Sequence, residues 1–267
     1  MTVDLPWAVP KIFSLVARSH PVVSVIIPVW NDVSALRVTL EWLSVEPGVF
    51  EVVVVDGGSV DGSREYAESH RDCRTVVSDR GRAKQLNAGA RVARGDVLLF
   101  LHCDTRLAGG ALTRLPRLLE ESAADFGAFR TRFEPRFALL DTLALLTRLA
   151  RPWCCFGDQG IFVRRKFFER VGCYPEIPLL EDVHWLRRAE RHGRMVRSPD
   201  VAVTSSRRFA EQGAVRQTSC NLWVLIRDRM GHDPVELAGL YDGARALKQN
   251  QADTPPVMIA DMPADLR

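Results

Sequence analysis

An aspartate and a histidine that follow an apolar segment are the first residues whose side chains could take part in chemistry. Asp104 comes after a run of apolar residues, where an unpaired charge near the core would be costly. Its carboxylate can bind a divalent cation, Mg²⁺ or Mn²⁺, which can in turn hold a diphosphate. Asp104 can also simply cap a turn with Thr105, but we favour the metal site. For His102, three roles stay open: metal ligand, partner of a ligand, or a histidine satisfied within the fold.

A second aspartate, Asp56, ends another apolar segment and precedes two glycines. A carboxylate there can accept hydrogen bonds from a base or a ribose, and Gly57 and Gly58 let the backbone approach a ligand closely. Aspartate and glycine also form ordinary turns. Taken alone, Asp56 is therefore explained equally well as the cap of the next turn.

Between these two acids lies a basic segment, residues 79–87, with Arg80, Arg82 and Lys84 around Gly81. Positive side chains at a helix start coincide with exposed N–H groups and favour an anion there. A charged run without context is more often a solvated helix face. Because this one should lie beside the two aspartates, we interpret Arg82 and Lys84 as an anion site.

An acidic pair, Glu181 and Asp182, follows two leucines and precedes a helical pattern. Acids at a helix start are ordinary caps, but such a pair can also supply a general base for an acceptor hydroxyl. Two further polar islands, residues 157–160 and 205–208, can contact an acceptor or a phosphate, or can be loops. The residues alone leave these alternatives open.

The elements that must position these residues alternate between strands and helices. Apolar strands are expected at residues 22–29, 51–55, 74–77 and 96–101. Strand–helix–strand units at this spacing predict crossovers and a parallel sheet in an α/β fold. Ligands bind beyond the carboxyl ends of such strands. The polar residues 30–32, 56–59 and 102–105 should therefore meet on one rim.

The second half of the chain is expected to complete the same domain with shorter elements. Helices are expected at residues 111–121, 137–150, 183–191, 215–230 and 234–247, and strands at 126–133, 161–163 and 195–203. The predicted organisation is a leader (1–20), one domain (21–248) with a nucleotide-binding half (21–110) and an acceptor half (111–248), and a mobile tail (249–267).

Composition and charge narrow the class of partner. The 267 residues are 46% apolar, and the formal net charge of +3 argues against nucleic acid. There is neither a signal peptide nor an apolar run of about 18 residues, so we expect a cytoplasmic protein without a membrane span. The apolar helix at 137–150 fits a core or homodimer contact better than a lipid-like acceptor or the inner membrane face.

The order of these motifs resembles family 2 glycosyltransferases of the GT-A fold, and within them the small bacterial branch associated with radical-SAM proteins. The resemblance covers residues 22–245. The motifs that carry it are residues 25–31 (VIIPVWN), 54–63 (VVDGGSVDGS), 95–105 (GDVLLFLHCDT), 157–165 (GDQGIFVRR) and 179–183 (LLEDV). An ordered set of this kind is far more specific than any one motif.

The resemblance implies a GT-A domain with C-terminal helices that transfers a sugar, with inversion, from a nucleotide diphosphate sugar such as a UDP-sugar to a small-molecule or lipid-like acceptor. Asp182 resembles the catalytic base, and Asp104 the last acid of the metal-binding D-x-D motif. We assign the nucleotide to Pro28, Asn31, Asp56, Gly58, Arg82, Lys84 and Asp104. We assign the acceptor or the diphosphate to Asp158, Gln159, Glu181, Arg207 and Arg208, and the metal to Asp104 and His102.

Two departures from the family pattern bear on function. His102 replaces the first acid of D-x-D, which puts the metal affinity and the choice of ion in question. Residues 205–209 lack the Q-x-x-R-W form of processive polysaccharide synthases, which argues against a polymerising synthase embedded in a membrane. Two alternatives stay open: a GT-A-like nucleotidyltransferase, whose G-x-G-x-R loop is missing here, and an inactive nucleotide-sugar-binding protein.

Overall fold

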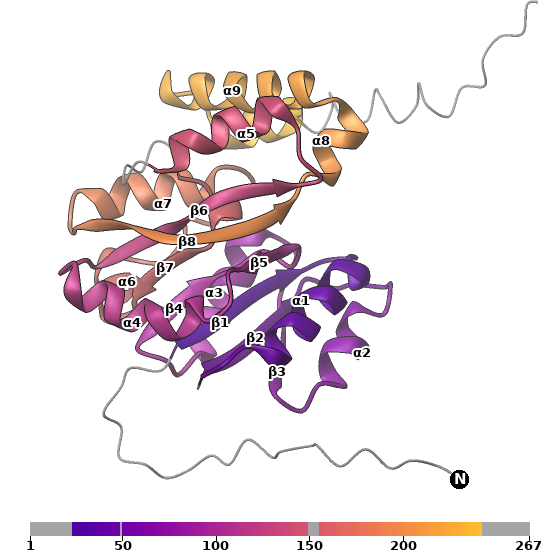
Figure 1. Ribbon diagram of the computed structural model, residues 1–267. Coiled ribbons are helices and arrows are strands. Elements are labelled where there is room, and N and C mark those ends of the chain that lie inside the picture. The colour runs from indigo at the N-terminus through magenta and orange to yellow at the C-terminus, as the bar shows by residue number, and fades with distance from the viewer. Residues whose placement is uncertain (1–22, 49, 149–154, 242–267) are drawn as a thin grey trace, which may run out of the picture.

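The four strands of the N-terminal half form the expected parallel sheet. The structure is a computed structural model and describes residues 23–48, 50–148 and 155–241 (Figure 1). The parallel strands, in their order across the sheet, are β3 (Cys73–Val77), β2 (Phe50–Asp56), β1 (Val23–Val29) and β4 (Val97–Phe100). The apolar residues of the central strands are buried on both faces, as in sheets that helices cover on each side.

Alternate residues of β1 divide the core into two layers. Val25 and Ile27 pack with helices α1 (Val33–Val45) and α4 (Ala111–Glu121), and the short helix α2 (Ser63–Glu68) joins the same layer. Ile26 faces the opposite way, toward helix α3 (Arg82–Val92). Gly89 permits a close approach of α3, because a β-carbon there would lie 2.4 Å from the Cγ2 atom of Ile26. Helix α3 is thus set directly on the sheet.

Four further strands extend the sheet beyond β4 in mixed directions. They are, in order, β7 (Ile161–Arg164), β6 (Phe126–Glu134), β8 (Met195–Ser205) and β5 (Thr105–Leu107). Strand β7 is antiparallel to both β4 and β6, while β6 and β8 are parallel. The expected α/β class, with a mostly parallel central sheet flanked by helices, is confirmed.

The helices of the second half match the expected positions only in part. They are α5 (Ala138–Ala144), α6 (Arg165–Val171), α7 (Glu181–Glu190), α8 (Arg207–Gln212) and α9 (Ala214–Arg229), with 3₁₀ turns at Leu145–Arg148 and Gly157–Gln159. Residues 234–241 are also helical. The helix expected at 137–150 is split, because α5 ends at Ala144 and a 3₁₀ turn follows. Helices α6 and α8 were not expected.

The expected leader (1–20), the tail (249–267) and the last residues of the helices predicted at 137–150 and 234–247 lie outside the described residues. Among the helices in the described part of the chain, none combines the length and the apolar character needed to cross a bilayer.

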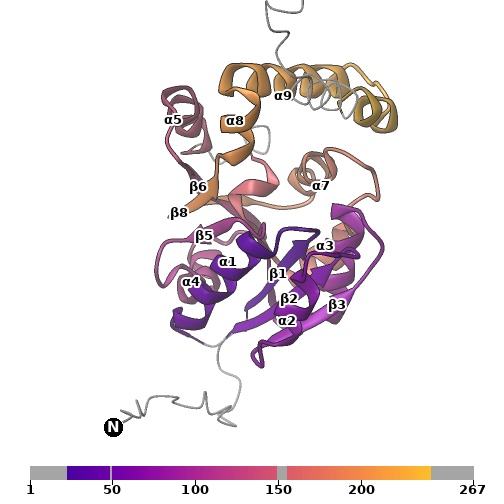
Figure 2. The ribbon, with the colours of Figure 1, turned by 90° about the vertical axis from the view of Figure 1, so that its right-hand side faces the viewer.

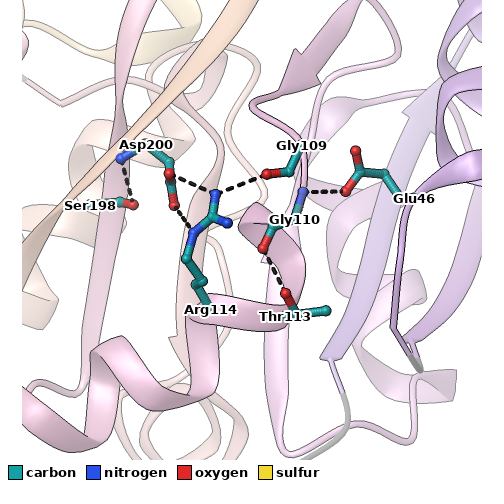
Figure 3. A network of polar contacts seen from close by, with 7 residues as sticks. All are labelled: Glu46, Gly109, Gly110, Thr113, Arg114, Ser198 and Asp200. Carbon is teal, nitrogen blue, oxygen red and sulfur yellow. Dashed lines mark hydrogen bonds and ion pairs between the residues drawn. The ribbon is translucent and has the colours of Figure 1, made fainter.

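A polar network joins the end of α1 to α4 and β8 (Figure 3). The Glu46 carboxylate accepts hydrogen bonds from the Trp42 indole (2.9 Å) and from the Gly110 N–H (2.9 Å). Arg114 in α4 donates to both carboxylate oxygens of Asp200, at 3.1 and 2.8 Å, and to the Gly109 carbonyl at 3.0 Å. This network ties the end of α1, the start of α4 and β8 together on the face that carries α1 and α4.

Candidate functional site

The loops after β1 and β2 are joined to each other at the carboxyl end of the sheet. Asn31 has a left-handed backbone (φ 49°); its N–H donates to the Ser59 hydroxyl at 2.9 Å, and its side-chain oxygen accepts from the Val60 N–H at 2.8 Å. The Asp61 carboxylate accepts from the Val33 N–H at 2.9 Å. Two of the expected polar clusters therefore meet, as the parallel topology requires.

Asp56 is buried at the end of β2 and accepts hydrogen bonds from the N–H groups of Gly58 (3.0 Å) and Ser59 (3.1 Å). This is the capping role that the sequence left open, and it fixes the carboxylate at the strand end. Gly58 has φ +85°, and, its two chain neighbours apart, no described residue has a side chain or backbone atom within 4 Å of the position that a β-carbon would take, so the space beside this glycine is open. Pro28 precedes the end of β1, and its partner in the sheet register is Val55 of β2.

Gln85, which sequence reasoning did not single out, holds the ends of β1 and β2 in place. Its buried side-chain amide donates to the Val29 carbonyl at 2.8 Å and to the Val55 carbonyl at 2.9 Å. A β-carbon on Gly57 would lie 3.0 Å from the same amide, so glycine is needed where this clamp meets the loop. The buried polar groups at the strand ends are thereby satisfied.

Arg82, in the first turn of α3, connects the N-terminal half to the acidic pair. It donates through Nε to the carboxylate of Glu181, which is only 2% exposed, and through Nη1 to the His102 Nε2 atom at 3.4 Å. These residues come from α3, α7 and the segment after β4. The structure thus joins three motifs that are far apart in the sequence.

Asp182 is buried beside this ion pair, in the first turn of α7. One carboxylate oxygen accepts from the Gly157 N–H at 2.5 Å, and the other from the Val183 N–H at 2.8 Å. A β-carbon on Gly157 would lie 3.0 Å from the His102 Nε2 atom and 3.1 Å from a carboxylate oxygen of Asp182. His102 and Asp182 therefore face each other across Gly157, whose backbone contribution no side-chain pattern in the sequence predicted.

Burial dominates the electrostatics of this region. It raises the pKa of Asp158 to about 7, with a further contribution from the carboxylates of Asp182 and Asp104. The Asp158 Oδ1 atom is buried without a hydrogen-bond partner among the described residues. Burial also lowers the pKa of His102 well below its usual range, with the positive charges of Arg82 and Arg208 in support. The imidazole is therefore neutral at neutral pH.

Burial likewise raises the pKa of Asp104, against the opposing effect of Arg208, and the pKa of Glu181, against that of Arg82. Tyr174, which sequence reasoning missed, has a buried hydroxyl without a hydrogen-bond partner among the described residues. Burial, together with the charges of Asp182 and Glu181, raises the pKa of this hydroxyl well above its usual range. These shifts mark a cluster of ionisable groups held close together and away from water.

Three other residues assigned to the site from the sequence, Arg207, Lys84 and Gln159, have contacts of their own. Arg207 of α8 forms an ion pair with Asp32 at 2.6 Å, which brings α8 to the loop after β1. Lys84 pairs with Asp79 at 3.1 Å on the surface. The Gln159 side chain is buried and accepts a hydrogen bond from Arg197 at 2.7 Å.

A divalent cation would find its protein ligand in Asp104. Among the described residues, no group of three or more His, Cys, Asp or Glu side chains is arranged to hold a metal ion. Asp104 lies within charge range of Asp158, whose Oδ1 atom has no partner in the described part, whereas His102 turns Nε2 toward Arg82. Carboxylate oxygens suit Mg²⁺ and Mn²⁺. The residues fit a cation that takes few ligands from the protein and the rest from a bound phosphate.

Known proteins resemble this chain in sequence. The model of "Glycosyl transferase family 2" matches residues 24–166. Glycosyltransferase AglE of Haloferax volcanii is 26% identical over 191 residues, which are 65% of this chain and 62% of AglE. The undecaprenyl-phosphate 4-deoxy-4-formamido-L-arabinose transferase of Pseudomonas aeruginosa is 34% identical over 122 residues, 41% of this chain and 35% of that protein. The chain thus spans less than two thirds of the length of these relatives.

Solved structures share the fold. The mannosyltransferase PcManGT from Pyrobaculum calidifontis, in complex with GDP-Man and Mn²⁺, superposes with a TM-score of 0.60 at 23% identity, covering 86% of this chain and 76% of PcManGT. S. aureus TarS 1-349 in complex with UDP gives a TM-score of 0.56 at 19% identity, covering 71% of this chain and 62% of TarS. The family model covers more than half of the chain, and these two structures share its fold. The chain belongs to glycosyl transferase family 2.

Proposed function

We propose that the protein transfers a sugar from a nucleotide diphosphate sugar, in the first instance a UDP-sugar, to an acceptor hydroxyl with inversion at the anomeric carbon. One observation carries this proposal: the buried Asp182 lies beside Arg82 and His102, at the edge of the sheet where the loops after β1, β2 and β4 end. An acid held at that edge can act on an acceptor next to a bound donor.

The donor would lie on the N-terminal half. The loop of Asp56 and Gly58 and the neighbouring Asn31 supply a fixed carboxylate, open space and backbone groups for a base and ribose. Positive charge for the diphosphate would come from Lys84 at the start of α3 and from Arg207 and Arg208 of α8. Support comes from the similar folds of TarS and PcManGT, whose structures contain UDP and GDP-Man.

Asp182 would act as the general base. Two N–H groups, those of Gly157 and Val183, hold its carboxylate in place at the start of α7, so its orientation is fixed. In the reaction, Asp182 takes the proton of the acceptor hydroxyl as the acceptor oxygen bonds to C1. The bond from C1 to the diphosphate oxygen breaks on the opposite face, and the nucleoside diphosphate leaves with the electron pair. A positioned base contributes about 10²- to 10⁴-fold.

Asp104 would hold a divalent cation in this scheme, with Asp158 near it and His102 beside it. Such a cation supplies charge stabilisation for the leaving diphosphate when it is bound. The arginines of α8 supply fixed positive charge of the same sign from the protein itself. The relative that acts on undecaprenyl phosphate supports a lipid-like acceptor alongside small alcohols.

The test uses donor hydrolysis, in which water takes the place of the acceptor. Purified protein is incubated with UDP-GlcNAc or GDP-Man and Mn²⁺; release of the nucleoside diphosphate is measured, and NMR identifies the first anomer formed. We expect free nucleoside diphosphate and an inverted anomer. Formation of a nucleoside monophosphate would favour a nucleotidyltransferase, and binding without any turnover would favour an inactive binding protein.

The Asp182→Asn variant tests the assigned base. We expect turnover to fall by about 10²-fold or more, while nucleotide binding, measured as a thermal shift with UDP, is retained. Asp72→Asn, at an exposed aspartate before β3, is the matched control and should keep full turnover. Unchanged turnover in Asp182→Asn would overturn the role of Asp182.

A further inference from the structure

A left-handed backbone is rare outside glycine, and two residues that adopt it lie beside the candidate site. In the described part, three residues other than glycine have this conformation: Asn31 (φ 49°), Ala123 (φ 48°) and Leu180 (φ 63°). Asn31 lies in the loop after β1, and asparagine tolerates a left-handed backbone, whereas leucine adopts it only at a cost. Leu180 directly precedes the acidic pair. Such a backbone persists where the surrounding structure imposes it, and it concentrates at functional sites.

Leu180 is also an atypical first residue for a helix. It is the N-cap of α7, a position where Ser, Thr, Asp or Asn in an extended backbone commonly accepts a hydrogen bond from the third N–H of the helix. Leu180 has neither the extended backbone nor an acceptor, and its side chain forms no cap. The third N–H, that of Val183, donates instead to the Asp182 carboxylate at 2.8 Å. Asp182 thus takes the place of the missing cap.

Two contacts with α3 fix the chain on both sides of Leu180. Figure 2 shows α3 and α7 in the same layer, where their apolar residues share one core cluster. The backbone of Tyr174 exchanges hydrogen bonds of 3.0 and 2.9 Å with the Asn87 side chain, and further along the chain Glu181 is held by Arg82. Both partners belong to α3. The turn at Leu180 therefore joins two fixed points and sets the direction in which the acidic pair leaves it.

The backbone of Leu180 is more closely tied to the site than its side chain. The side chain is half-buried and belongs to neither of the two clusters of buried apolar side chains in the described part. The Leu180 carbonyl, by contrast, accepts a hydrogen bond from the His184 N–H at 3.0 Å, which begins α7. The conformation of residue 180, and not the bulk of its side chain, is thus the feature that the site depends on.

We propose that Leu180 is a positioning residue for the acidic pair, because its left-handed backbone directs the two carboxylates to their partners. Glu181 thereby reaches Arg82 of α3. Asp182 reaches the Gly157 N–H at 2.5 Å. An extended backbone at residue 180 would swing the start of α7, and both carboxylates with it, away from these partners. The catalytic consequence rests on the proposed function, in which Asp182 takes the proton of the acceptor hydroxyl.

The test compares three substitutions that differ in how well they adopt a left-handed backbone. Leu180→Gly adopts it freely, Leu180→Ala about as well as leucine, and Leu180→Val poorly, because a β-branched side chain is strained there. We expect Leu180→Val to release the nucleoside diphosphate from UDP-GlcNAc or GDP-Man, with Mn²⁺, about tenfold or more slowly, with an unchanged thermal shift by UDP. Leu180→Gly and Leu180→Ala should stay within about threefold of the unmodified protein.

Ala123→Val is the matched control, since it places the same β-branched side chain on a left-handed backbone after α4. It should lower the temperature of unfolding, as Leu180→Val does, and keep the turnover number of the folded protein. A second readout does not depend on catalysis: amide hydrogen exchange at the start of α7, where Asp182 holds the Val183 N–H. We expect faster exchange there in Leu180→Val, and exchange like that of the unmodified protein in the other three variants.

Three results would overturn the role of Leu180: full turnover in Leu180→Val, a loss in Leu180→Ala or Leu180→Gly as large as that in Leu180→Val, or equal exchange at the start of α7 in all variants. The second result would assign the effect to the side chain. If neither the unmodified protein nor any variant releases a nucleoside diphosphate, the proposed function fails. The exchange measurement then still decides whether Leu180 positions the acidic pair.

Discussion

Removing the Arg82 guanidinium should destabilise the fold, because it leaves the Glu181 carboxyl buried without its cation. Deleting one partner of a buried ion pair costs about 3–5 kcal/mol. The Glu181 side chain is 2% exposed but that of Arg82 is 37% exposed, so water already screens part of the pair. We therefore expect Arg82→Ala to lower the free energy of unfolding by about 2–3 kcal/mol at neutral pH.

The loss should depend on pH in a defined direction. Burial raises the pKa of Glu181 even with Arg82 present, and without Arg82 it rises further. A carboxyl whose pKa is raised in the folded state contributes stability below its unfolded pKa and loses that contribution as the pH rises through the folded value. The destabilisation by Arg82→Ala should thus be smallest near the ordinary pKa of 4.5 and grow above it.

The assay is urea unfolding, followed by circular dichroism, of the unmodified protein, Arg82→Ala, Glu181→Gln and the double variant. In the double variant no charge is left unpaired, so it should be more stable than the sum of the two single effects predicts, by about 1 kcal/mol or more. Arg64→Ala, which removes one partner of the exposed pair with Glu68, is the control and should change little. Additive effects, or a loss by Arg82→Ala that stays constant from acid to neutral pH, would refute the reasoning.

The other predictions concern the neighbourhood of Asp182. Gly157→Ala places a β-carbon 3.0 Å from the His102 Nε2 atom and 3.1 Å from Asp182, so turnover of donor should fall about tenfold or more with little change in nucleotide binding by thermal shift; equal turnover would show that the acid has room to move. Asp158→Asn should stabilise the protein more at pH 8 than at pH 5 in thermal unfolding. The pKa of the Asp158 carboxyl is raised in the folded protein to about 7 from its ordinary value of 3.8, so the folded state loses stability as the pH rises from 3.8 through 7, and Asn removes that loss. Parallel pH profiles of the two proteins would contradict that assignment.

The parallel half of the sheet was predictable from the sequence because its two central strands, β1 and β2, are short, rich in β-branched residues and buried on both faces. The second half was less so. Strand β5 has only three residues, and its partner β8 lies about 100 positions away in the sequence. No local sequence pattern therefore predicts it. Helix α8 has six residues and buries none of them, and it therefore lacks the apolar periodicity by which a helix is recognised.

The sequence indicated which acidic residues belong to the candidate site, but it did not indicate most of the contacts that these residues make. The spacing of motifs pointed to Asp104 and Asp182, since strand ends and helix starts are visible in a sequence. It assigned Arg82 to an anion, whereas in the structure the guanidinium is paired with Glu181, 99 positions away. The N–H group of Gly157 is a backbone donor, which residue type cannot reveal.

Helix α3 contacts two parts of the candidate site through residues on adjacent turns. Gln85 ties it to the ends of two strands beneath the loop of Asp56, and Arg82 ties it to the acid that precedes Asp182. A rigid helix cannot tilt at one of these points while staying still at the other. The loop of Asp56 and the start of α7 are consequently positioned by the same piece of backbone, and a single turn of α3 separates the two contacts that position them.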